Sequence, residues 1–194
     1  MKNICVFAGS SKGKKDSYLR IAQNLGKDIV KHNYSMVYGG GSLGLMGVVA
    51  NSVLEQGGQV TGVITKQLNE AEVGHKGLTD LIVVSTMHQR KKLMAKLSEA
   101  IISLPGGVGT WEEFFEALAW NQLGIHSKPI VLLNVENYYS DLYRFAKKAV
   151  SDGFLPYDTF QDFYLVDNTS SALEIINNFT KKDLNTWFQR LSKN

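Results

Sequence analysis

Short apolar runs alternate along the chain with longer segments in which apolar residues recur at helical spacing. Unbroken apolar runs of this length predict strands that are buried on both faces. The predicted strands are residues 3–8, 36–38, 60–64, 81–84, 100–104 and 129–133, with an edge strand at 163–166. Amphipathic helices are predicted within residues 18–29, 49–54, 87–99, 111–123, 138–152 and 170–179. This alternation predicts an α/β fold, a doubly wound, Rossmann-like parallel sheet with helices on both faces.

Length and composition favour a single domain. The chain has 194 residues, of which 44% are hydrophobic, enough for one well-filled α/β domain and short for two. We expect this domain to span residues 1–180. Residues 181–194 carry apolar residues at helical spacing and predict a C-terminal helix that packs on the domain or on a dimer partner. Residues 66–79 show no clean periodicity and should cross the rim of the sheet.

The net charge and the single cysteine indicate which partners and which cellular compartment to expect. The formal net charge is +3 and the basic residues are scattered, so nothing favours nucleic acid as a partner. Cys5, the only cysteine, lies in the first predicted strand, where a buried inert thiol is expected. A reducing cytoplasm fits this composition, and no apolar stretch approaches the length of a membrane span. The histidines show no metal-ligand spacing, so no metal site is expected.

A glycine-rich segment at residues 105–110 connects the fifth predicted strand to a long amphipathic helix. Gly106, Gly107 and Gly109 let the backbone approach a ligand closely and leave amide N–H groups free to face it. The N-terminus of the helix adds about half a positive charge at the same place. The sequence therefore predicts an anion site in this segment, for a phosphate in particular.

Two carboxylates follow the glycine-rich segment. Glu112 and Glu113 would repel a bound phosphate unless cations elsewhere balance the site. A structural alternative is open for Glu113, because Thr110 and Glu113 have the spacing of a capping box, in which each side chain bonds the backbone amide of the other residue. On spacing alone the capping role is favoured.

Two further glycine-rich loops are expected at the same edge of the sheet. Residues 9–11 follow the first strand and residues 39–47 follow the second, so both lie at carboxyl ends of parallel strands, where such folds bind ligands. The spacing of Gly39, Gly41 and Gly44 matches a dinucleotide fingerprint. The third strand ends without the acidic residue that would hold a ribose, so nicotinamide binding is disfavoured and close approach to a nucleotide or a neighbouring loop is expected.

Arg90 is the charged residue whose position is most informative. At about 100° per residue, it falls in the middle of a stripe formed by Met87, Leu93, Met94 and Leu97. A guanidinium that points inward needs an anion, either a carboxylate of the protein or a bound ligand. The alternative is that Arg90 extends outward along its aliphatic stem. Its helix starts at the carboxyl end of the fourth strand, beside the loop that needs a cation, which favours the inward orientation.

The helix at 111–123 should bury one aromatic stripe. The expected buried residues are Trp111, Phe114, Phe115, Leu118 and Ala119. Glu113 lies almost opposite and should be solvated unless a cleft or a second subunit covers that side. Trp120 lies off the stripe, which suggests a dimer contact; alternatively it covers the adjoining strand.

Two motifs carry a resemblance to a known family. Residues 87–91, Met-His-Gln-Arg-Lys, and residues 105–113, Pro-Gly-Gly-Val-Gly-Thr-Trp-Glu-Glu, resemble the paired MHxRK and PGGxGTxxE signatures of the cytokinin riboside 5'-monophosphate phosphoribohydrolases, the LONELY GUY family. Proteins of this family were formerly labelled lysine decarboxylase-like. The similarity includes residues 9–11, 39–47 and 123–129 and extends to about Tyr139.

The resemblance implies hydrolysis of the N-glycosidic bond of a nucleoside 5'-monophosphate, AMP or an N6-substituted cytokinin precursor, without metal or organic cofactor and as a homodimer. Arg90 and Glu113 match the catalytic pair of the family. Together with the glycine-rich loops, the resemblance gives the remaining expected substrate-binding residues as Gly9, Ser10, Gly41, Glu72, Met87, Lys91, Gly106, Gly107, Val108, Gly109, Thr110 and Glu112. Ala119 departs from the family, many members of which have a threonine there, so the substrate preference stays open.

The sequence leaves other functions open. A non-catalytic nucleotide or molybdenum-cofactor carrier on the same fold would use the same phosphate site, but it would need Glu113 only as a helix cap. A dinucleotide oxidoreductase is a weaker alternative. Pyridoxal phosphate chemistry has no support, because no lysine is marked as a Schiff-base site.

Overall fold

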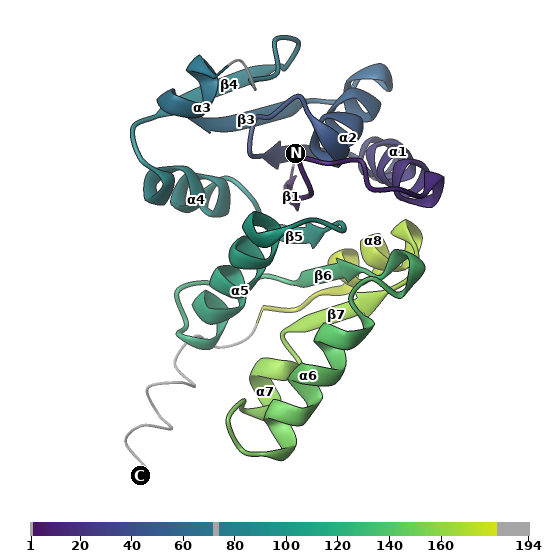
Figure 1. Ribbon diagram of the computed structural model, residues 1–194, viewed down its shortest axis with the longest axis vertical. Coiled ribbons are helices and arrows are strands. Elements are labelled where there is room, and N and C mark those ends of the chain that lie inside the picture. Colours follow the sequence, from purple (N-terminus) through teal and green to yellow (C-terminus); the bar gives the residue numbers. More distant parts are fainter. Residues whose placement is uncertain (1, 72–73, 182–194) are drawn as a thin grey trace.

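The computed structural model describes residues 2–71 and 74–181 and shows a sheet of seven strands (Figure 1). Every neighbouring pair of strands is parallel, and the strand order is β4-β3-β2-β1-β5-β6-β7. The strands are β1 (Lys2–Phe7), β2 (Tyr34–Tyr38), β3 (Val60–Thr65), β4 (Asp80–Val84), β5 (Ala100–Ser103), β6 (Ile130–Leu133) and β7 (Phe163–Val166). The predicted doubly wound parallel sheet is confirmed, with β7 at one edge.

Helices cover both faces of the sheet and enclose two cores. The helices are α1 (Asp16–Lys31), α2 (Gly44–Glu55), α3 (Lys66–Glu70), α4 (Met87–Lys96), α5 (Val108–Gln122), α6 (Ser140–Ser151), α7 (Tyr157–Phe160) and α8 (Thr169–Asn178), with a 3₁₀ turn η1 at Val135–Asn137. Alternation along β1 divides its side chains: Ile4 and Val6 pack with α1, α2 and α8, whereas Cys5 and Phe7 pack with α4, α5 and α7. Cys5 is fully buried, as expected for an inert thiol.

The start of α5 differs from the prediction. The helix begins at Val108 rather than Trp111, because Gly107 is extended and serves as its N-cap. Thr110 therefore lies inside the first turn of α5 and not at its cap, and the N-cap makes no side-chain hydrogen bond. The proposed capping box between Thr110 and Glu113 is wrong. The capping box that does form belongs to α4, where Thr86 and Gln89 bond each other's backbone amides.

Two short helices were not predicted. α3 lies in the segment expected to be irregular, and the Thr65 side chain accepts a hydrogen bond from the Leu68 N–H to start it. α7 follows Pro156, whose fixed φ suits the N-cap position. The helix expected at residues 181–194 falls almost wholly outside the described residues.

The sheet brings the glycine-rich loops together at one edge. β1 lies between β2 and β5, so the strand order reverses beside it, and ligands of doubly wound sheets bind at this reversal. The Gly9 N–H donates to the Pro105 carbonyl at 3.1 Å, and the Leu45 N–H donates to the Gly9 carbonyl at 2.9 Å. Gly44 has φ +62°, and a Cβ there would lie 2.2 Å from the Ser10 carbonyl carbon. Only glycine fits where these loops cross.

None of the helices within residues 2–71 and 74–181 is long and apolar enough to cross a membrane.

The core beneath α5 gives a test of this packing. Phe114 is 2% exposed and meets the Phe163 ring edge-on, whereas its neighbour Phe115 is 45% exposed. We expect Phe114→Ala to lower the free energy of unfolding by about 3–5 kcal/mol, because a large buried ring leaves a cavity. The matched control Phe145→Ala, which removes a ring of α6 that is 66% exposed, should cost about 1 kcal/mol or less. Urea unfolding of both variants measures the difference, and equal losses would contradict the burial of Phe114.

Candidate active site

Arg90 points inward, as its place on the helix predicted. It lies in the first turn of α4, and its side chain is 11% exposed. Nε donates to the Val63 carbonyl at 2.9 Å and Nη2 to the Gly39 carbonyl at 3.1 Å. Nη1 lies 3.4 Å from Oε1 of Glu113. Two backbone carbonyls from β3 and the β2–α2 loop therefore fix the guanidinium, and one carboxylate balances its charge.

Gly39 allows this approach of Arg90 to the backbone. A Cβ at Gly39 would lie 1.8 Å from Nη2 of Arg90. Any side chain at this position would displace the guanidinium from both the Gly39 carbonyl and Glu113. The first glycine of the fingerprint-like loop thus makes room for an arginine of the protein.

Glu113 is buried against α4 rather than solvated. Its side chain is 13% exposed, because α5 turns so that Thr110, Phe114, Ala117 and Leu118 face the core. Burial raises the pKa of Glu113 to about 7; the positive charges of Arg90 and Lys91 oppose this rise, and the negative charges of Glu112 and Glu116 add to it. Glu113 therefore releases its proton closer to neutral pH than an exposed carboxyl group does.

The predicted aromatic stripe of α5 is wrong in part. Trp111 is 43% exposed and Phe115 45% exposed, and Ala119 is also exposed. Phe114 and Leu118 are buried, as predicted. The helix is rotated from the expected orientation because its flank carries the carboxylates that pair with Arg90 and Lys91. The hydrophobic periodicity of α5 alone cannot predict these contacts with α4.

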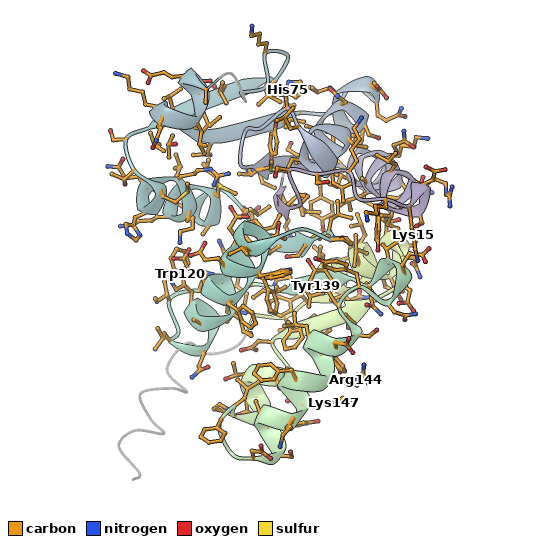
Figure 2. All side chains as sticks on the ribbon, viewed as in Figure 1. Lys15, His75, Trp120, Tyr139, Arg144 and Lys147 are labelled. Atoms are coloured by element: carbon orange, nitrogen blue, oxygen red, sulfur yellow. The ribbon has the colours of Figure 1, made fainter. Side chains whose placement is uncertain are left out.

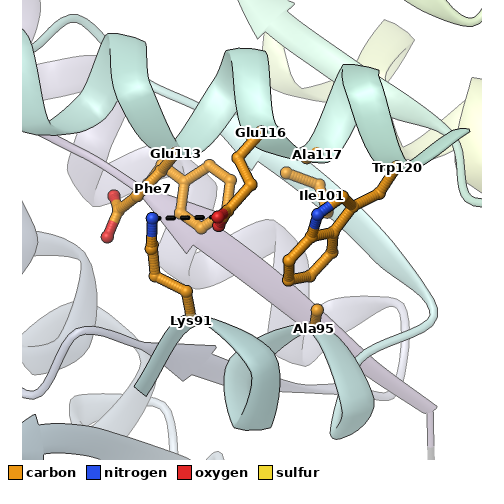
Figure 3. Close-up of a pocket in the computed structure, with 8 residues that line it drawn as sticks. All are labelled: Phe7, Lys91, Ala95, Ile101, Glu113, Glu116, Ala117 and Trp120. Atoms are coloured by element: carbon orange, nitrogen blue, oxygen red, sulfur yellow. Dashed lines mark ion pairs between the residues drawn. The ribbon is translucent and has the colours of Figure 1, made fainter. Parts of the chain in front are cut away.

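Lys91 lies between two carboxylates of α5, Glu112 and Glu116, and Figure 3 shows its ion pair with Glu116. Its Nζ donates to Glu112 and lies 2.9 Å from Oε1 of Glu116, and its side chain is 10% exposed. Burial by itself lowers the pKa of Lys91, but the hydrogen bonds to Glu112 and Glu116 outweigh this and raise it. Lys91 thus links α4 to α5 through two ion pairs and places a positive charge near Glu113.

Trp120 lines a small pocket that Lys91, Glu113 and Glu116 also line, and it lies at the end of that pocket away from Lys91 (Figure 3). Trp120, labelled in Figure 2, is half-buried, lies with Ala95 and Ile101 in the lining of this pocket, and meets the His126 ring edge-on. This packing agrees with the alternative that Trp120 covers the adjoining strand, here β5 through Ile101.

The glycine-rich segment before α5 keeps its amides open. Gly107, Val108 and Gly109 are exposed, and within the described part of the chain the backbone N–H groups of residues 107–110 donate no hydrogen bond to the protein. The first N–H groups of a helix lack partners within the helix and carry its positive dipole end. Residues 9–11 and 105–107, with Tyr18, Leu45 and Tyr138, line a cavity of about 340 Å³ beside them. This arrangement is suited to a phosphate group.

The family model described as "possible lysine decarboxylase" matches residues 46–176. The chain belongs to this family. Curated relatives carry a more specific name. A probable cytokinin riboside 5'-monophosphate phosphoribohydrolase of Oryza sativa subsp. japonica is 52% identical over 155 residues, which cover 80% of this chain and 68% of the relative. A cytokinin riboside 5'-monophosphate phosphoribohydrolase of Arabidopsis thaliana is 51% identical over 154 residues, 79% of this chain and 72% of the relative.

Solved structures share the fold. A structural-genomics X-ray structure superimposes with a TM-score of 0.71 at 25% identity and covers 92% of this chain and 100% of that chain. The molybdenum cofactor carrier protein of Chlamydomonas reinhardtii gives a TM-score of 0.69 at 23% identity, over 91% of this chain and 96% of that chain. At this identity the carrier protein shows the fold alone.

The expected site residues of this family member fall into two adjoining groups. Arg90, Glu113, Lys91 and Glu112 form the charged cluster between α4 and α5, and Met87 Sδ lies 3.3 Å from Nη1 of Arg90. The residues that line the cavity, together with the amides of 107–110, form the second group.

One expected site residue, Gly41, lies outside these groups, and two residues of the groups were not predicted. Gly41 instead pairs with Gly74 in an isolated bridge, and Glu72 lies outside the described residues. Glu116, the second partner of Lys91, and Tyr138, which bonds the glycine-rich loop, were not predicted. The spacing of Glu112 and Glu116 on one face of a helix was a signal for the first.

Burial of Glu113 gives the protein a pH-dependent stability. In the unfolded chain this carboxyl has its ordinary pKa of 4.5, and in the folded protein its pKa is about 7. Between these values the folded state keeps a proton that the unfolded state has lost, so this contribution to stability is full below pH 4.5 and is lost as the pH rises to about 7. Glu113→Gln removes the effect.

We expect the stability of Glu113→Gln, relative to the unsubstituted protein, to rise by roughly 1–3 kcal/mol between pH 5 and pH 8. Denaturant unfolding of both proteins at several pH values measures it. A difference that does not change with pH would show that Glu113 titrates normally.

Proposed function

We propose that this protein hydrolyses the N-glycosidic bond of nucleoside 5'-monophosphates, AMP and N6-substituted cytokinin riboside 5'-monophosphates, to the free base and ribose 5-phosphate. The observation that carries the proposal is the buried Arg90–Glu113 pair at the carboxyl edge of the sheet, beside the exposed backbone N–H groups of residues 107–109. The names of the curated relatives support the same reaction.

Glu113 is suited to the bond cleavage. Loss of the base leaves oxocarbenium-like positive charge on the sugar, which a nearby carboxylate stabilises. The bond from the anomeric carbon to the base nitrogen breaks, and a water oxygen bonds to that carbon. Because its pKa is about 7, Glu113 can accept the proton that this water loses, and its protonated form can supply one to the departing base.

Arg90 and the glycine-rich loop place the substrate. The guanidinium is held by the Gly39 and Val63 carbonyls, so it keeps the Glu113 carboxylate in one orientation. The open N-terminus of α5 takes the 5'-phosphate, whose negative charge suits the helix dipole and the free N–H groups. Binding energy from the phosphate then holds the sugar still during the reaction.

The proposal includes a homodimer that works in a reducing cytoplasm. Trp111 and Phe115 lie one turn apart on α5 and are both nearly half exposed, as is Met87 on α4. Apolar side chains gathered beside a site are typical of an interface, here with a second copy of the chain. The sole cysteine is buried and forms no disulfide, which fits a reducing compartment.

We expect Glu113→Gln and Arg90→Ala to reduce the release of adenine from AMP by a factor of about 10² or more, because each removes a group that acts in the transition state. The matched control Glu174→Gln, which changes an exposed carboxylate of α8, should retain full turnover. Chromatography of the free base, together with circular dichroism of each variant, measures the outcome.

The same variant separates an enzyme from a carrier. Glu113→Gln should still bind AMP, because the glycine-rich loop is unchanged. Binding without turnover in the unsubstituted protein would favour the carrier alternative, and unchanged turnover in Glu113→Gln would remove Glu113 from the mechanism.

We expect the protein in solution to have twice the mass of one chain, and Phe115→Asp to shift it toward a single chain, because a charge would be buried at the interface. Size-exclusion chromatography with light scattering measures both. A monomeric unsubstituted protein at micromolar concentration would contradict the dimer.

A further inference from the structure

Two consecutive tyrosines donate hydrogen bonds to the segment that precedes α5. The Tyr138 hydroxyl donates to the Gly106 carbonyl. The Tyr139 hydroxyl donates to the Leu104 carbonyl at 2.7 Å, in the buried interior (Figure 2). Both tyrosines lie in the connection between β6 and α6, so a separate part of the chain sets the orientation of the phosphate loop.

The bond from Tyr138 fixes a whole peptide unit. In a planar trans peptide, the carbonyl of one residue and the N–H of the next point in opposite directions. The described peptide bonds are all trans. With the Gly106 carbonyl turned toward Tyr138, the Gly107 N–H must point away from it. The backbone of a glycine rotates easily about φ and ψ. The orientation of the peptide unit between Gly106 and Gly107 therefore depends on this hydrogen bond.

The Gly107 N–H is available to a ligand. Gly107 is the N-cap of α5 and is exposed, and no protein acceptor for its N–H exists among the described residues. Tyr138 and Gly107 both line the cavity of about 340 Å³ at the strand edge. The tyrosine therefore determines the direction of one of the amides at the proposed phosphate site.

We propose that Tyr138 is a positioning residue that holds the Gly107 N–H toward the phosphate of the substrate. This inference rests on the proposed function. Loss of the Tyr138 hydroxyl should therefore weaken binding of the substrate's phosphate group. The Arg90–Glu113 pair, which acts at the sugar, should not be affected.

Tyr139 provides a matched control within the same segment. Its hydroxyl bonds the carbonyl of Leu104, and the next residue is Pro105, which has no N–H. Removal of the Tyr139 hydroxyl therefore leaves no amide free to turn. It removes a buried hydrogen bond and should lower stability without changing phosphate recognition.

The experiment compares Tyr138→Phe and Tyr139→Phe with the unsubstituted protein. The dissociation constants of ribose 5-phosphate and inorganic phosphate are measured by calorimetry, KM and kcat with AMP by release of adenine, and thermal stability by circular dichroism. We expect Tyr138→Phe to raise KM and both dissociation constants by about fivefold to tenfold, with kcat within about twofold. Tyr139→Phe should leave all of these unchanged and lower Tm.

Three outcomes would overturn the positioning role. These are unchanged ribose 5-phosphate binding in Tyr138→Phe, an equal loss in Tyr139→Phe, or no binding of either phosphate compound by the unsubstituted protein. If the protein binds ribose 5-phosphate but releases no adenine from AMP, the proposed function fails, and the calorimetric comparison of the two variants still decides the role of Tyr138.

Discussion

The arrangement of the site depends on the compensation of one buried positive charge. Arg90 lies in the interior between β3, the β2–α2 loop and α5, and each of these contributes an acceptor. An unpaired guanidinium in such a place would cost several kcal/mol, roughly as much as a small domain has to spare. The Gly39 carbonyl, the Val63 carbonyl and Glu113 must therefore converge, and their convergence fixes α4 and α5 relative to the sheet.

The same burial gives Glu113 its chemistry. Ion pairing with Arg90 favours the charged carboxylate, whereas removal from water and the neighbouring Glu112 and Glu116 favour the protonated form. The balance places its pKa near 7, where a carboxyl group can both take and give a proton. Lys91, held by Glu112 and Glu116, limits how far those two charges raise the pKa of Glu113.

Much of this architecture was predictable from local sequence. The apolar runs gave the strands, the glycine-rich loops followed from their place after strands, and the inward orientation of Arg90 followed from a charge within an apolar stripe. The rotation of α5 was not predictable, because Trp111 and Phe115 suggest burial by their composition alone. Contacts with other helices determine which face of α5 turns inward. Glu113 and Glu116 lie on the face that meets α4, and the hydrophobic periodicity of α5 cannot predict these partners. Tyr138 was missed for the same reason: its partner, Gly106, lies 32 residues earlier in the chain.

The position of β1 at the centre of the sheet has a consequence for how the protein is made. The site combines loops from the first quarter of the chain with the helices on either side of β5, and β1 and β5 are paired through residues as distant as Ile4 and Ala100. Closing a chain segment of this length carries an entropic cost that local contacts cannot offset early in folding. An emerging polypeptide that has formed only β1, β2 and α1 therefore contains Gly9 and Gly39 but neither Arg90 nor Glu113, and the active centre cannot assemble before β5 pairs with β1.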